Sequence, residues 1–114
     1  MTLCSTSLLI HIACERIIGS LQETIELIRV IAGHGSPKQW CSYLRINGST
    51  CNQVDHSRQH PGDVIIDVTK AYLDQKLNPC WEEVIYILCK NLNKNKAAEE
   101  LSEKYDVDYA SVCG

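Results

Sequence analysis

The sequence lacks an excess of basic residues. Its 11 Lys and Arg residues stand against 14 Asp and Glu residues, which gives a formal net charge of -3 at pH 7. A domain that binds nucleic acid usually carries a basic surplus or one dense basic stripe, because it must neutralise phosphates. The composition therefore argues against nucleic acid as a partner. The alternative to the function inferred below is a small helical nucleic-acid-binding domain. In it, the helix after Ser36-Pro37 would lie in a groove of the nucleic acid.

A long uninterrupted hydrophobic run is also missing. The apolar stretch over residues 2–18 is interrupted by His11, Glu15 and Arg16, and no cationic segment precedes it. Such a stretch is too short and too charged for a membrane span, and it is a poor secretory signal. We expect a packed helix here and no association with a membrane.

Recognised catalytic motifs do not occur. The chain has no P-loop, GxGxxG, GxSxG or HExxH motif, so we expect no enzyme, no catalytic residues and no cofactor. The best metal-ligand group is Cys51, His56 and His60, with Cys41 as a conceivable fourth ligand. Zinc sites usually combine two pairs of ligands, with the members of each pair close together in the sequence. We therefore favour solvated loop residues and predict no metal.

The seven cysteines include no CxxC pair, and their number is odd. Cys14, Cys41 and Cys89 fall in apolar helical patterns, where cysteine commonly behaves as a small buried hydrophobe. We therefore predict mostly free thiols and a cytoplasmic location, where the compartment is reducing. Asn47-Gly48-Ser49 matches the glycan acceptor pattern, but chance matches to so short a pattern are routine.

The residues that are present indicate one helical domain. A chain of 114 residues that is 45% hydrophobic and 22% charged is typical of a single soluble domain with one core. Its apolar residues recur at intervals of three and four, which favours helices over strands. No internal repeat or low-complexity linker marks a second domain.

Helix start and stop signals divide the first part of the chain. A helix over about residues 5–18 is expected to end at Gly19. Ser20 caps a second helix over residues 21–32, with Glu23 as its capping-box partner. The apolar stripe predicted for this second helix consists of Leu21, Ile25, Ile28 and Ala32.

Five more helices are predicted. Ser36 caps a short helix that has Pro37 at its first position. A brief helix is expected over about residues 50–58, followed by a longer one over residues 63–75, although Val64-Ile65-Ile66 alone would suit a strand. The clearest helix begins at Asn78-Pro79, and its apolar residues follow helical spacing: Trp81, Val84, Ile85, Leu88 and Leu92. The fifth runs from Asn93 to about Tyr105, with a loose tail after it.

The order and spacing of these segments resemble the death-domain superfamily, and most closely a death domain proper. The match rests on Ser36-Pro37-Lys38-Gln39-Trp40-Cys41-Ser42-Tyr43-Leu44, Ala71-Tyr72-Leu73, Asn78-Pro79-Cys80-Trp81-Glu82-Glu83-Val84-Ile85 with Leu88, and Lys96-Ala97-Ala98-Glu99-Glu100-Leu101. In that family one tryptophan on the second helix and another opening the fifth help to build the core, and Trp40 and Trp81 stand in those places. The predicted structural core is Trp40, Leu44, Trp81, Val84, Ile85, Leu88 and Leu101.

The resemblance implies an all-α fold, a six-helix antiparallel Greek-key bundle with an additional N-terminal helix. Residues 1–19 would form that helix, packed on the bundle. Residues 20–105 would form the death-fold domain, and residues 106–114 a C-terminal tail.

Charged residues gather in groups of one sign, and these groups are the predicted partner-binding sites. The basic residues are Lys90, Lys94 and Lys96 at the join of the last two helices, and Arg45 and Arg58 beside the short middle helix. The acidic residues are Asp63, Asp67 and Asp74 on one helix, and Glu99, Glu100 and Glu103 on the last helix. Any one of these residues alone is most simply part of a solvated helix face.

Separate patches of opposite sign can dock one onto the other, and such contacts extend into rings or filaments. By resemblance, we expect an adaptor or receptor module of apoptotic or innate-immune signalling that recruits other death-fold domains and self-assembles. A decoy that caps such assemblies, and a zinc-dependent or redox-active helical protein, stay open as further hypotheses.

Overall fold

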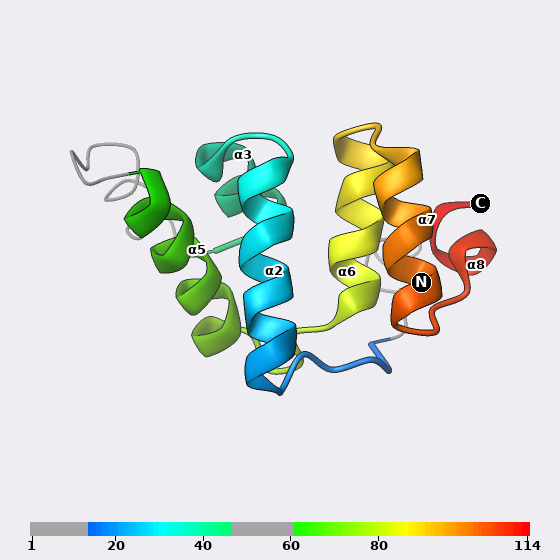
Figure 1. The fold of residues 1–114 in the computed structure, drawn as a ribbon, viewed down its shortest axis with the longest axis horizontal. Helices are drawn as coiled ribbons and strands as arrows, with labels where there is room; N and C mark the ends of the chain where they lie inside the picture. Colours follow the sequence, from blue (N-terminus) through cyan, green and yellow to red (C-terminus); the bar gives the residue numbers. More distant parts are fainter. Residues whose placement is uncertain (1–13, 47–60) are drawn as a thin grey trace, which may run out of the picture.

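The computed structural model describes residues 14–46 and 61–114, and within them the protein is helical (Figure 1). The only strand-like pairing in this part of the chain is an isolated antiparallel bridge between Ile17 and Cys80. The elements are α2 (Leu21–Gly33), α3 (Pro37–Tyr43), α5 (Pro61–Gln75), α6 (Trp81–Tyr86), the π-helix η1 (Ile87–Asn91), α7 (Asn95–Lys104) and α8 (Tyr109–Cys113). The predicted all-α class is confirmed.

The helices form two groups that share one core. Helices α2 and α5 lie side by side and run in opposite directions, and α3 packs against both of them (Figure 1). In the other half, α6 continues into η1, and α7 runs back antiparallel to them with α8 at the outer edge. None of the described helices is long and apolar enough to cross a membrane.

Local sequence signals set the starts of α2 and α3. Ser20 and Glu23 form a complete capping box at the start of α2, and Ser36 and Gln39 form another at the start of α3. Each box satisfies backbone N–H groups that have no partner inside the helix. Both predicted starts are confirmed.

Trp40 and Trp81 are fully buried in the same hydrophobic cluster, which joins the two groups of helices. The Trp81 ring stacks on Tyr105 with 4.1 Å between the ring centroids. The Trp81 indole N–H donates to Glu23 Oε2 at 3.2 Å, and the Trp40 indole N–H donates to the His34 carbonyl. The other predicted core residues are buried too: Leu44, Val84, Ile85, Leu88 and Leu101.

The predicted inner face of α2 is wrong. The buried residues are Leu27, Val30 and Ile31, whereas Leu21 is 76% exposed and Ile25 is 38% exposed. Two sets of apolar residues with helical spacing run along this helix. The packing of α2 on α5 decides which of the two sets is buried. Periodicity within α2 alone does not distinguish them.

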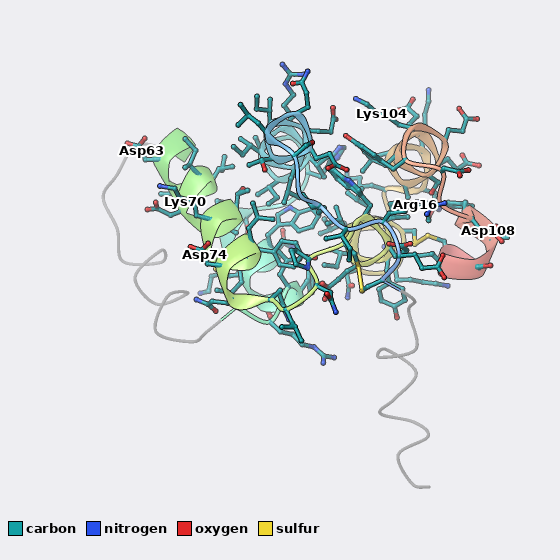
Figure 2. The ribbon with its side chains drawn as sticks, turned by 90° about the horizontal axis from the view of Figure 1, so that it is seen from below. Arg16, Asp63, Lys70, Asp74, Lys104 and Asp108 are labelled. Carbon is teal, nitrogen blue, oxygen red and sulfur yellow. A yellow bond between two sulfur atoms is a disulfide. The ribbon has the colours of Figure 1, made fainter. Side chains whose placement is uncertain are left out.

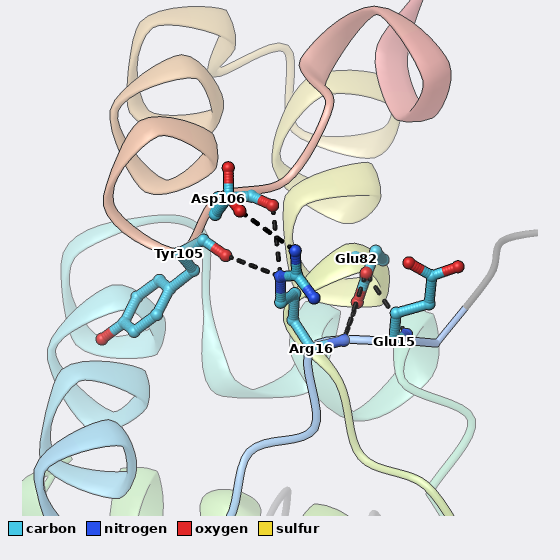
Figure 3. Close-up of polar contacts among 5 residues, drawn as sticks. All are labelled: Glu15, Arg16, Glu82, Tyr105 and Asp106. Atoms are coloured by element: carbon cyan, nitrogen blue, oxygen red, sulfur yellow. Dashed lines mark hydrogen bonds and ion pairs between the residues drawn. The ribbon is translucent and has the colours of Figure 1, made fainter.

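The N-terminal segment, residues 14–19, is not the end of a helix as predicted. It runs extended across the start of α6, where Ile18 N donates to Pro79 O at 2.8 Å and Trp81 N donates to Arg16 O at 2.9 Å. The Glu82 carboxylate accepts from the backbone amides of Glu15 and Arg16 at 3.1 to 3.3 Å (Figure 3). These bonds to α6 replace the hydrogen bonds of a helix. The remainder of the predicted first helix lies outside the described residues.

Among the described residues, four cysteines form disulfides, which corrects the prediction of mostly free thiols. Cys14 pairs with Cys80, and Cys89 pairs with Cys113. Cys41 is a buried thiol, as predicted. The pairs join residues far apart in sequence, which spacing motifs do not reveal.

The C-terminal residues are ordered rather than loose. Helix α8 packs against α6 and α7, and Cys113 at its end is bonded to Cys89 of η1. Half-buried Val107, Tyr109 and Val112 pack against the core. These apolar contacts explain why the segment after Asp106 does not behave as a free tail.

Candidate interaction surfaces

Lys90, Lys94 and Lys96 form a basic patch at the turn between η1 and α7. All three side chains are exposed, and none forms an ion pair with a residue that the structure describes. The turn is held by a hydrogen bond of 2.7 Å from Lys94 N to Leu88 O. Asn93 adopts a left-handed conformation, φ 57°, in which asparagine is favoured over most residues. That these three lysines bind a partner stays a prediction.

The basic patch borders an open depression. Lys94 and Lys96 line it together with His34, which follows α2, and Glu100 of α7. Glu100 thus lies beside the lysines rather than with the other acidic residues of α7. Its carboxylate reduces the positive charge at that edge of the patch.

Glu99 and Glu103 form a second charged surface on α7. They line a depression between α7 and α8 together with Asp106. Asp106 is 94% exposed although its carboxylate accepts from Arg16 Nη2 at 3.1 Å. Arg16 Nε also donates to the Tyr105 and Asp106 carbonyls (Figure 3). Together these contacts hold the N-terminal segment against the end of α7. The acidic surface thus lies next to a structural contact.

Asp63, Asp67 and Asp74 are exposed on α5, the helix predicted to carry them. Figure 2 shows Asp63 and Asp74 on the outer side of this helix, with Lys70 between them. The spacing from residue 63 to 67, 70 and 74 places the four side chains in one row, which we call the α5 stripe. Sequence reasoning missed Lys70, although its position in the same row could have been read from the helical period. The net charge of the stripe is therefore smaller than three carboxylates suggest.

Arg45 does not line the depression beside the basic patch. Arg45 follows α3 and lines a separate pocket with Lys76, and Arg58 lies outside the described residues. The helix predicted over residues 50–58 also lies outside them, as do the candidate metal ligands Cys51, His56 and His60. No group of three potential metal ligands occurs within residues 14–46 and 61–114.

Two contacts between helices were also missed. Lys104 of α7 donates to Glu26 of α2 at 2.6 Å, and this hydrogen bond raises the pKa of Lys104. Tyr72 of α5 donates to Glu83 of α6 at 2.8 Å and accepts from Cys80 N at 3.0 Å. Burial first, and then the charge of Glu83, raise the pKa of Tyr72, which keeps the hydroxyl protonated as a donor.

Comparisons of the chain with models of known protein families, with curated proteins and with solved structures found no match.

Proposed function

We propose that this chain is a death-fold interaction module of apoptotic or innate-immune signalling. It recruits death-fold partners, including further copies of itself, through complementary charged surfaces. The observation that supports the proposal best is the separation of two exposed surfaces of opposite sign. Helix α5, which carries the stripe, lies toward one end of the long axis, and the turn between η1 and α7, which carries the basic patch, lies in the other half of the molecule (Figure 1).

The Greek-key arrangement is part of the same proposal. Helices α2, α3 and α5 would take the places of the first, second and fourth helices, α6 with η1 that of the fifth, and α7 that of the sixth. Trp40 on α3 and Trp81 at the start of α6 support this alignment, because both rings are buried in one cluster. Each ring then anchors several short helices that would be marginal alone.

A contact between the basic patch of one copy and the α5 stripe of the next joins two different surfaces. Such a heterologous contact leaves one free surface at each end, so assembly continues into a filament unless the rotation closes a ring. Because each exposed pair contributes little, the contact depends on several charges acting together. The output is a raised local concentration of whatever effector is bound or fused to the module.

A cytoplasmic location also belongs to the proposal. Disulfides are rare in that compartment because its thiols are kept reduced. The proposal therefore requires that the bundle keeps its fold and its charged surfaces when both pairs are reduced. The buried cluster around Trp40 and Trp81 supports this, because most of its residues come from α2, α3, α5 and α6.

Charge reversal tests the contact. Lys94→Glu/Lys96→Glu should abolish self-association in size-exclusion chromatography and negative-stain imaging, while circular dichroism shows an unchanged helix content. Lys94→Glu alone should weaken association several-fold, and Arg29→Glu, an equal change at an exposed site on α2, should leave it unchanged.

A swapped pair identifies the partner surface. Asp63→Lys/Asp67→Lys should also fail to self-associate, and mixing it with Lys94→Glu/Lys96→Glu should restore a complex, because the reversed surfaces again have opposite signs. If Lys94→Glu/Lys96→Glu assembles as the unchanged protein does, the assignment of the basic patch is wrong.

A further inference from the structure

A pocket of about 400 Å³ lies between α3, the end of α5 and the helix formed by α6 and η1. Its apolar walls include Tyr43 of α3, Tyr86 of α6 and Ile87 of η1. Its volume falls within the range of small-molecule sites, which are mostly concave, with apolar walls and a few polar groups. We call it the α3–η1 pocket.

The polar groups of this pocket have an excess of positive charge. Arg45 and Lys76 contribute two cations, and Glu83 contributes one carboxylate. Neither cation forms a salt bridge with any residue in the described ranges. Glu83 is already engaged, because its Oε1 accepts from the buried Tyr72 hydroxyl at 2.8 Å. The pocket therefore offers one net positive charge and two cationic donors.

The backbone is irregular at two places that line the pocket, Arg45 and η1. Arg45 has a left-handed conformation, φ 57°, which is uncommon for a residue other than glycine. On the opposite wall the α-helix widens into η1, and Leu92 N donates to Ile87 O at 3.0 Å, five residues back. Asn91, at the end of η1, also lines the pocket. Such irregularities in otherwise regular elements frequently accompany functional sites.

We propose that the α3–η1 pocket binds a carboxylate attached to an aromatic or aliphatic body. The guanidinium of Arg45 and the ammonium of Lys76 would hold the carboxylate, and Asn78 and Asn91 would add amide donors. Tyr43, Tyr86 and Ile87 would contact the apolar body. One net positive charge matches a carboxylate better than a doubly charged phosphate, because Glu83 repels the second negative charge.

The test is a titration followed by amide and side-chain NMR signals. Phenylacetate is the probe, and phenylacetamide is its uncharged match. Phenylacetate should shift the side-chain signals of Asn78 and Asn91 and bind at least tenfold more tightly than phenylacetamide. Arg45→Ala/Lys76→Ala should weaken binding of phenylacetate at least tenfold. Arg29→Ala/Lys70→Ala removes two exposed cations elsewhere and should leave the affinity unchanged.

A second pair of probes identifies the source of the carboxylate. A short peptide ending in phenylalanine is compared with the same peptide amidated at its C-terminus. If the free-acid peptide binds more tightly than phenylacetate, the natural ligand is the C-terminus of a polypeptide. If phenylacetate binds more tightly, the natural ligand is a free small molecule. Both outcomes support the proposal.

Equal binding of phenylacetate and phenylacetamide would overturn the proposal, and so would an unchanged affinity in Arg45→Ala/Lys76→Ala. That variant is first checked for a spectrum as well dispersed as that of the unchanged protein. The inference does not depend on the proposed function, because assembly is tested at the basic patch and ligand binding at Arg45 and Lys76.

Discussion

At the scale of single residues, Glu23 joins two parts of the molecule. Its Oε1 accepts from the Ser20 and Gly19 amides at 3.0 and 3.2 Å, and its Oε2 accepts from the Trp81 indole. Burial by itself raises the pKa of Glu23, but these hydrogen bonds and the one from the Ser20 hydroxyl outweigh it and lower the pKa. The sequence predicted the capping box, but it gave no signal for the bond to Trp81, which is 58 residues away.

The lowered pKa of Glu23 predicts a dependence of stability on pH. A carboxyl whose folded pKa lies below its unfolded value stabilises the protein above the unfolded value, near 4.5, and this contribution is lost as the pH falls through the folded pKa. Glu23→Gln keeps an acceptor for the capping box but loses the charge. We expect it to cost about 1 kcal/mol at pH 7.

Urea unfolding of both proteins at several pH values between 7 and 3 measures this difference. The stability gap between them should shrink as the pH falls below about 4.5, because the unchanged protein then becomes neutral at this position too. A gap that stays constant down to pH 3 would show that the charge of Glu23 does not stabilise the fold.

Lys70 is the residue that most weakens the α5 stripe as an acidic surface. Because Lys70 lies between Asp67 and Asp74 in the row, Lys70→Glu replaces one positive charge there by one negative charge. If the stripe receives the basic patch, this variant should associate several-fold more tightly, and the gain should disappear at high salt. Sedimentation at 50 and 500 mM salt provides the measurement, and weaker association at low salt would contradict the proposed pairing.

At the scale of elements, the sequence predicted the positions of the main helices well and the two ends of the described chain badly. Helices α2, α3, α5, α6 and α7 follow from apolar periodicity, and capping boxes also mark the starts of α2 and α3. The N-terminal segment and α8 depend on bonds to distant residues, such as Arg16 to Asp106 and Cys89 to Cys113. No pattern within a short window contains that information.

Reduction of the disulfides should release these ends and leave the rest folded. Cys113→Ser removes the bond that holds α8, and we expect it to lower the free energy of unfolding by about 3 kcal/mol, as estimated from loop closure. Hydrogen exchange should then rise in α8, while the emission of Trp40 and Trp81 stays that of buried indoles. A red shift of that emission in the folded baseline would mean that the core itself depends on the bond.

At the scale of the whole molecule, the sequence predicted the core but not the arrangement of its surfaces. Trp40 and Trp81 were identified from their helices, because large rings with helical spacing are almost always buried where a domain has one core. The position of Arg45 in a pocket with Lys76 depends on how α3 packs against α5. That packing depends on side-chain fit between helices, which apolar periodicity within one helix does not encode.

The two disulfides of the described residues close two covalent rings that do not overlap, because one spans residues 14 to 80 and the other residues 89 to 113. A protease that cuts one peptide bond inside either ring opens it without separating the pieces. Between Cys14 and Cys113, only the bonds from Cys80 to Cys89 would divide the protein when cut once, and they lie in α6 and the start of η1. A single nick elsewhere in this span would therefore become visible on a gel only after a thiol reductant is added.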